Sequence, residues 1–202
     1  MYTARKGLIA LMLFLSGPAI AADLAALKAS CDGCHGPLGV SAHSEIPTIA
    51  GQTPKFIAKT LRGFQMWDRP CIKSTYKTGE KAGTKTDMCK VSNQLSAEDI
   101  TAVAAWYGEQ VFVPANQEFD TALASAGEAL HAAGCETCHE QGGKLAGRGP
   151  RLAGQWTPYL AATIKYVPTG EHLCPPMMER KVAGFSKEQI AQLLNYYASQ
   201  QE

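Results

Sequence analysis

Two short segments carry the same reactive pattern: two cysteines separated by two residues and followed at once by a histidine. They are C-D-G-C-H at residues 31–35 and C-E-T-C-H at residues 135–139. Two thiols one helical turn apart can add to the two vinyl groups of one porphyrin, and the next residue then stands beneath the iron. The pattern predicts two covalently bound c-type haems, held by Cys31, Cys34, Cys135 and Cys138 with His35 and His139 as axial ligands.

Two other chemistries also use paired cysteines. A zinc site can be built from two C-x-x-C pairs, and a thioredoxin-like dithiol needs only one pair. Neither chemistry calls for a histidine directly after both pairs, so covalent haem attachment is the favoured interpretation.

The first residues have the composition of an export signal. Arg5 and Lys6 precede an apolar run at residues 8–15, and small residues follow at 19–21. The run is shorter than the roughly 20 residues that a spanning helix needs, so we expect cleavage near residue 21, a periplasmic location and no membrane span afterwards. The 17 basic and 18 acidic residues that remain exclude a strongly basic surface for nucleic acid.

The haem motifs belong to an internal duplication. P-T-I-A-G-Q at residues 47–52 recurs as P-R-L-A-G-Q at 150–155, an offset of 103, and the closing segments at 95–100 and 185–190 are offset by 90. The first repeat therefore has about 13 additional residues between Gln52 and Leu95. Together with the expected signal peptide at 1–21, the duplication predicts two domains, at 22–113 and 114–202.

Helical periodicity dominates both repeats, and no alternating strand pattern of useful length is present. The closing helices begin at serine caps and carry the aromatic pairs at 106–107 and 196–197, which we expect to pack against the first helices. The predicted fold class is all-α: two tandem cytochrome c-like domains, each a small helical bundle around one haem. The expected helices lie at residues 22–30, 55–64, 96–107, 121–133, 159–167 and 186–198, with a linker at 111–120.

An electron-transfer haem needs a second axial ligand, usually methionine or histidine. Met88 lies eight residues before Ser96, and Met178 lies eight residues before Ser186. Because the two methionines occupy the same place in their repeats, we predict both as iron ligands. Met177 is the alternative ligand for the second haem.

The remaining histidines give fewer indications. His43 and His172 lie in predicted loops, so ligation of an iron by two histidines stays open as the minor option. His131 lies on the helix before the second motif, where we expect a surface residue. Pro47 and Pro150 are expected to pass the proximal histidines, where a carbonyl can accept the imidazole N–H and orient the ring.

Three further cysteines lie outside the haem motifs. A disulfide between Cys71 and Cys89 would tie down the long loop that ends at Met88. Cys174 could then be a buried thiol near the haem, an intermolecular cysteine or part of a soft-metal site, and burial is favoured. As a thiolate ligand to iron, Cys174 would instead indicate a catalytic haem.

The duplicated pattern of haem motif, P-x-x-A-G-Q and methionine resembles the dihaem cytochrome c4 group along the whole mature chain. In the second half, the strings at residues 119–124, 152–160 and 197–201 resemble the dihaem subunit of flavocytochrome c sulfide dehydrogenase. This resemblance implies a heterodimer in which a separate FAD-containing flavoprotein oxidises sulfide and this chain accepts the electrons. The insertion at 65–88 and Cys174 depart from the family pattern.

Electron counting agrees with such a partnership. A reduced flavin carries two electrons and each haem iron accepts one, so two haems can hold the product of one turnover. The chain has no G-x-G-x-x-G fingerprint after a strand, so we expect the flavin and the catalytic residues on the partner. Two alternatives stay open: a free cytochrome c4-like carrier to a downstream cytochrome or terminal oxidase, and a haem enzyme with an open or thiolate-ligated iron.

Overall fold

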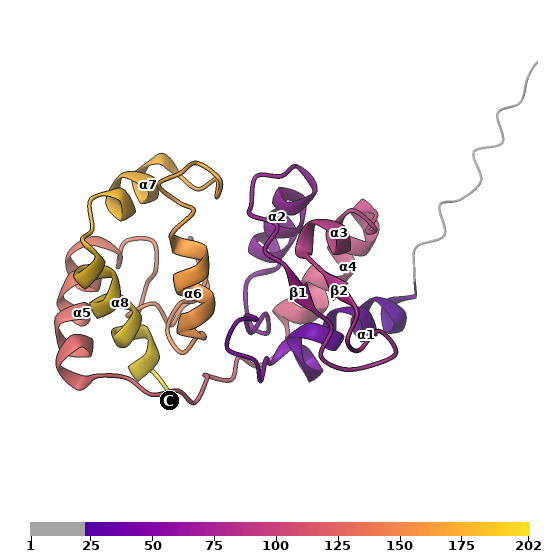
Figure 1. Cartoon of the computed structure of the whole chain (residues 1–202), viewed down its shortest axis with the longest axis horizontal. Helices are drawn as coiled ribbons and strands as arrows, with labels where there is room; N and C mark the ends of the chain where they lie inside the picture. The colour runs from indigo at the N-terminus through magenta and orange to yellow at the C-terminus, as the bar shows by residue number, and fades with distance from the viewer. Residues whose placement is uncertain (1–22) are drawn as a thin grey trace, which may run out of the picture.

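The computed structural model describes residues 23–202, so the export signal expected at 1–21 lies outside the described residues. Figure 1 shows two groups of helices side by side, joined by an extended segment. Each group contains one haem motif, and the predicted all-α fold of two tandem helical units is confirmed. None of the helices in this described part is both long and apolar enough to cross a membrane.

Both repeats place their helices in the same order. The first consists of α1 (Leu24–His35), the 3-10 turn η1 (Pro37–Gly39), α2 (Pro54–Gln65), β1 (Ser74–Thr75), β2 (Lys85–Thr86), α3 (Met88–Ser92) and α4 (Ala97–Gly108). The second consists of α5 (Thr121–Gly134), α6 (Thr157–Ile164), α7 (Pro176–Ala183) and α8 (Lys187–Ser199). The predicted linker lies between α4 and α5 and has no regular structure.

The closing helices α4 and α8 begin with the predicted capping boxes. The hydroxyl of Ser96 accepts a hydrogen bond from the Asp99 amide, and the Asp99 carboxylate accepts one from the Ser96 amide, both at 3.0 Å. Ser186 and Gln189 form the same reciprocal pair at the start of α8. A capping side chain of this kind stabilises a helix end by about 1 kcal/mol.

Tyrosines of the closing helices hold each last helix against the first helix of its repeat. The hydroxyl of Tyr107 donates to the carboxylate of Asp32 on α1 at 2.8 Å, and the tyrosine is almost completely buried. In the second repeat, the hydroxyl of buried Tyr197 lies 3.0 Å from Nδ1 of His131 on α5. The packing role predicted for these aromatic residues is therefore confirmed.

The prediction that His131 lies on the surface is wrong. The side chain is only 1% exposed, and it takes the place of the core residue Leu27 of the first repeat. Its Nε2 lies 2.9 Å from the Glu136 carboxylate and 3.0 Å from the carbonyl of His139. Because Tyr197 contacts the other ring nitrogen, burial leaves neither nitrogen without a partner. His131 therefore links α5 to the second haem motif.

The additional residues of the first repeat form a small β-hairpin beside α1 (Figure 1). From Cys71 to Met88 there are 17 positions, but from Cys174 to Met178 only 4. The difference of 13 equals the length of the segment 74–86, which contains β1 and β2. The hairpin is therefore the insertion that the first repeat has and the second repeat lacks.

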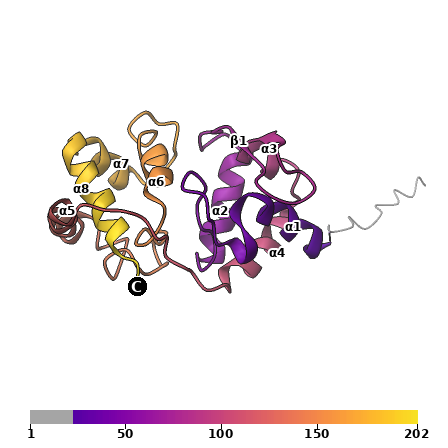
Figure 2. The same cartoon turned by 60° about the horizontal axis from the view of Figure 1, so that its bottom comes forward.

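The contact between the repeats has an approximate twofold symmetry. The side-chain amide of Gln52 accepts from the backbone N–H of Arg151 at 2.9 Å and donates to its carbonyl at 3.1 Å. Gln155 makes the same two bonds with Thr48, at 3.0 and 2.8 Å. These glutamines are equivalent in the two repeats, so each repeat offers the same side chain to the backbone N–H and carbonyl of the equivalent residue in the other. Figure 2 shows α2 and α6 on facing sides of this boundary, as in Figure 1.

Candidate haem centres

The first candidate centre is built at the end of α1. His35 is the last residue of the helix, and its Nδ1 donates to the carbonyl of Pro47 at 2.8 Å. This bond leaves Nε2 with the lone pair that a metal requires and fixes the ring orientation. Burial lowers the pKa of His35, so the imidazole is neutral and able to bind iron.

The second candidate centre repeats this geometry. Nδ1 of His139 donates to the carbonyl of Pro150 at 3.0 Å, and burial lowers the pKa of His139 as well. Gly149 lies directly against this ring, because a Cβ at that position would be 2.6 Å from Cε1 of His139. The predicted role of the two proline carbonyls is confirmed in both repeats.

The same two peptides also carry the contact between the repeats. The carbonyl of the Pro47–Thr48 peptide accepts from His35, while its N–H donates to the side chain of Gln155. The Pro150–Arg151 peptide bonds in the same way to His139 and to Gln52. Consecutive hydrogen bonds through one peptide polarise each other, so each glutamine acts on the proximal histidine of the other repeat.

The first cysteine of each motif is half-buried and lies against a closing-helix tyrosine. Burial raises the pKa of Cys31 to about 11 and also raises that of Cys135. The second cysteines differ: Cys34 is half-buried and Cys138 is exposed. All four thiols are unbridged, so each is chemically able to form a thioether with a porphyrin vinyl group.

The candidate methionine ligands lie on short helices that follow the middle helix of each repeat. Met88 is the first residue of α3 and packs against the hydrophobic core of the first repeat. In α7, Met178 is half-buried while Met177 is 61% exposed. This difference favours Met178 over Met177 as the residue that faces the interior of the second repeat.

The two histidines of the alternative ligation lie in different surroundings. His43 is half-buried in the loop before Pro47. His172 is buried, and desolvation together with the nearby Arg69 lowers its pKa to about 4.

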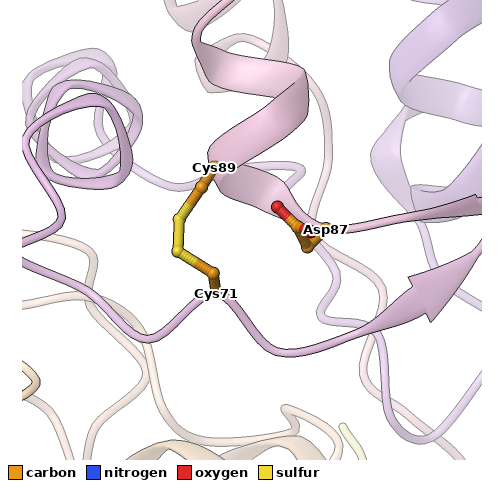
Figure 3. A group of neighbouring side chains, drawn as sticks. All are labelled: Cys71, Asp87 and Cys89. Carbon is orange, nitrogen blue, oxygen red and sulfur yellow. A yellow bond between two sulfur atoms is a disulfide. The ribbon is translucent and has the colours of Figure 1, made fainter.

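A disulfide joins Cys71 to Cys89 and restrains the segment that carries Met88 (Figure 3). The Cα atoms are 5.5 Å apart, and the pairing is the one expected from the sequence. Asp87 lies beside the bridge and caps α3 by accepting from the Lys90 amide at 2.9 Å. Within the described residues these three side chains form a possible metal-binding group, but the disulfide already occupies both sulfur atoms.

Cys174 is half-buried on the loop before α7, so the expected burial is only partial. Desolvation raises the pKa of its thiol, which therefore stays protonated at neutral pH. Its position is equivalent to that of Cys71 by the offset of 103 residues. The first repeat uses this position for a disulfide, while the second keeps a free thiol.

Two buried nitrogen atoms lack a hydrogen-bond partner within the described chain: Nε of Arg69 and Nδ1 of His172. The two residues are equivalent in the repeats, at an offset of 103, and lie near the contact where the Leu173 amide donates to the Asp68 carbonyl at 2.8 Å. Buried polar groups are normally paired, so these atoms suit a bound group that carries carboxylates. Haem has two such carboxylates.

Sequence reasoning missed this pair, although a signal was available. R-P-C at residues 69–71 and H-L-C at 172–174 align at the same offset as the P-x-x-A-G-Q motifs. Extending the repeat alignment beyond Gln52 would have identified Arg69 and His172 as equivalent polar residues, and would have placed the insertion after Cys71.

The comparisons with known proteins agree with this geometry. A sequence-family profile described as "Cytochrome C oxidase, cbb3-type, subunit III" matches residues 122–196. Cytochrome c4 of Azotobacter vinelandii is 33% identical over 178 residues, covering 79% of this chain and 80% of that protein. The "Thiosulfate dehydrogenase electron acceptor" of Thiomonas intermedia is 28% identical over 176 residues, covering 82% of this chain and 75% of that protein.

A solved structure extends the likeness to three dimensions. The crystal structure of reduced recombinant cytochrome c4 from Pseudomonas stutzeri has a TM-score of 0.68 to this chain at 27% identity, covering 88% of this chain and 98% of that one. The similarity spans both repeats. The chain therefore belongs to the cytochrome c4 family of haem-containing electron carriers.

Proposed function

We propose that this chain is a periplasmic carrier with two c-type haems that accepts electrons from a dehydrogenase of reduced sulfur compounds. The observation that carries the proposal is the repeated centre, in which a histidine oriented by a proline carbonyl follows two unbridged cysteines. The domains at 22–113 and 114–202 each hold one haem, and residues 1–21 direct export.

Each domain supplies the same set of groups to its haem. Thioether bonds form at Cys31 and Cys34 in the first domain and at Cys135 and Cys138 in the second. Nε2 of His35 or His139 and the thioether of Met88 or Met178 would hold the iron. A bound haem supplies a one-electron couple, and methionine ligation raises its potential, which suits an electron acceptor.

The side chains at the domain boundary orient the two centres. Gln52 and Gln155 hold the peptides that position the proximal histidines, so neither ring can turn without disturbing the contact between the domains. Arg69 and His172 offer buried nitrogens to haem carboxylates. Two haems held by histidines that are fixed in this way would exchange an electron with little reorganisation of the protein.

The electron donor that we favour is an FAD-containing flavoprotein that oxidises sulfide, as in flavocytochrome c sulfide dehydrogenase. The flavin delivers two electrons, and two irons take one each. The relative named as a thiosulfate dehydrogenase electron acceptor supports the broader class of donor, a reduced-sulfur dehydrogenase. The second candidate is a free carrier to a downstream cytochrome or oxidase, which the relatives named cytochrome c4 favour.

Purification of the native protein from the periplasm under mild salt tests these assignments. We expect two haems per chain in a pyridine haemochrome assay, together with a flavin-bearing polypeptide and rapid haem reduction on adding sulfide. Reduction by thiosulfate together with a different partner would identify the donor as a thiosulfate dehydrogenase, which is also a dehydrogenase of reduced sulfur compounds. A chain that elutes alone and stays oxidised with both compounds would support the free carrier, and fewer than two haems would contradict the repeated centre.

The ferric spectrum tests the remaining alternative, a catalytic haem. We expect the long-wavelength charge-transfer band of methionine-ligated iron from both centres and no binding of added cyanide at low concentration. An iron that binds the ligand readily, or that shows a thiolate spectrum removed by Cys174→Ser, would indicate a catalytic site instead.

A further inference from the structure

The insertion of the first repeat covers the haem motif of that repeat. The backbone amides of Lys77 and Thr78 both donate to the carbonyl of Gly33, at 2.7 and 3.0 Å. Gly33 lies between the two haem-binding cysteines, directly before Cys34. The hairpin is therefore fastened to the motif itself by main-chain hydrogen bonds.

Side chains of the hairpin complete this cover. The ring of Tyr76 is buried and lies so close that a Cβ on Gly33 would be 3.0 Å from its Cδ1. The Lys77 ammonium forms a 2.6 Å ion pair with Glu45, which joins the hairpin to the loop before Pro47. A Cβ at position 33 would crowd the ring of Tyr76 and the carbonyl of Thr78, so glycine suits this position.

The second haem motif has no such cover within the described residues. Thr137 stands where the first motif has Gly33, and its side chain is exposed. Cys138 is also exposed, whereas the equivalent Cys34 is half-buried with its Sγ 3.9 Å from the Thr75 carbonyl of the hairpin. The same edge of the two centres is therefore shielded in one repeat and open in the other.

We infer that redox partners exchange electrons with this protein at the open edge around Thr137 and Cys138, and that the first centre is reached through the second. The second cysteine of each motif marks a haem edge, since the thioether ties the porphyrin to that side chain. Electron transfer between proteins falls steeply with the distance between edges, so the hairpin selects one of two otherwise equivalent entry points. This inference rests on the proposed two-haem carrier but not on the identity of its donor.

The exchange is a simple one-electron step. A protein partner with a surface redox centre is oxidised by one electron, and the ferric iron of the second repeat becomes ferrous. The electron then passes to the ferric iron of the first repeat, which restores the acceptor at the open edge. No proton or covalent bond is transferred.

Two matched substitutions of exposed threonines test the inference on the haem-loaded protein. Thr137→Trp places a bulky group at the open edge, and Thr78→Trp places the same group on the hairpin. The probe is a small blue-copper protein, whose copper absorbance is distinct from that of haem in stopped-flow measurements. We expect Thr137→Trp to lower the second-order rate constant about tenfold and Thr78→Trp to change it less than twofold.

Dithionite serves as the control, because a small reductant does not need a docking surface. Both variants should keep two haems per chain and be reduced by dithionite at the wild-type rate. An equal or larger effect of Thr78→Trp, or no effect of Thr137→Trp, would overturn the inference. If Thr137→Trp matures poorly, Thr137→Arg provides the second variant for the same comparison.

A binding measurement gives an independent readout. Lysine acetylation followed by mass spectrometry should show protection of Lys144, close after the second motif, when the blue-copper protein is bound. Lys81 on the hairpin should stay as reactive as in the free protein. Protection of Lys81 alone would contradict the assignment of the docking site to the edge around Thr137 and Cys138. This outcome does not depend on which dehydrogenase is the natural electron donor.

Discussion

The two repeats hold the same candidate ligand residues in different surroundings. In the first, α1 continues through the motif to His35, and a hairpin and a disulfide enclose the centre. In the second, α5 ends at Gly134 and the motif continues as turns with an exposed Cys138. The comparison teaches that duplication preserved the chemistry, while an insertion and a few core replacements gave the two centres different access to solvent and partners.

The largest expected effect comes from the axial methionines. Met88→Ala and Met178→Ala should each remove about half of the methionine-to-iron charge-transfer band and make one iron bind cyanide, because each supplies one of two equivalent ligands. Met177→Ala is the matched control and should leave the absorption spectrum unchanged. Loss of the band in Met177→Ala, with Met178→Ala unaffected, would reverse the assignment in the second repeat.

Gly149 provides a test confined to the second centre. Gly149→Ala should displace the His139 ring, because the added Cβ would lie 2.6 Å from Cε1, and the strain should lower the free energy of unfolding by about 1–3 kcal/mol. Gly147→Ala introduces only an ordinary 3.6 Å contact and serves as the control. Thermal unfolding and the low-spin ferric spectrum would measure both effects. Equal stability of the two variants would mean that the ring is not held where the structure places it.

The disulfide should stabilise the first repeat alone. Replacing Cys71 and Cys89 by serine opens a loop with a sequence separation of 18, for which chain entropy predicts a loss of about 3 kcal/mol. Cys174→Ser, at the equivalent position of the second repeat, should change stability by less than about 0.5 kcal/mol. Urea unfolding followed separately at each haem would show whether the loss is confined to the first centre.

The reciprocal glutamines test whether the twofold contact is energetically symmetric. Gln52→Ala and Gln155→Ala should each lower the unfolding free energy by about 1–3 kcal/mol, because each leaves buried backbone groups without a partner. Each should also raise the reduction potential of the other repeat's haem, since the proline carbonyl then accepts more weakly from the proximal histidine. Potentiometric titration checks the direction, and a shift within the mutated repeat instead would contradict the crossed arrangement.

The smallest effect is expected at the ion pair beneath the hairpin. Lys77 lowers the pKa of Glu45, so the pair stabilises the folded state above the ordinary glutamate range and loses this contribution as the pH falls through the lowered value. Because Glu45 is largely exposed, Glu45→Gln should cost only about 0.5 kcal/mol. Hydrogen exchange at the Lys77 and Thr78 amides would measure the loosening. Unchanged protection of these amides between pH 7 and pH 3 would show that the pair does not hold the hairpin.

Much of the fold could be predicted from the sequence because its signals are local. The haem motifs, the serine caps of α4 and α8 and the repeated proline segments each depend on a few neighbouring residues. The pairing of Cys71 with Cys89 was also accessible, since both flank one loop. The ligand roles of Met88 and Met178 stay predictions, which rest on the place of each methionine eight residues before the serine cap of its repeat.

Features that depend on contacts between residues far apart in the sequence could not be predicted in this way. His131 has the local setting of a surface residue, and its burial depends on Tyr197 from the far end of the same repeat. The docking of the hairpin on Gly33 joins residues more than 40 positions apart. Crossed hydrogen bonds of Gln52 and Gln155 depend on how two domains meet, which no segment of either repeat specifies by itself.

The crossed glutamine contact has the form of an interface between two identical subunits. When one patch meets its own copy across a twofold axis, residue i contacts residue j and j contacts i, as Gln52 with Arg151 and Gln155 with Thr48 do here. Two identical single-domain chains that associated as a homodimer would form the same contact. Joining the two halves through a linker makes their association independent of concentration and lets each half differ from the other. The hairpin is such a difference. In a homodimer of identical chains it would be present twice and would cover both haem motifs.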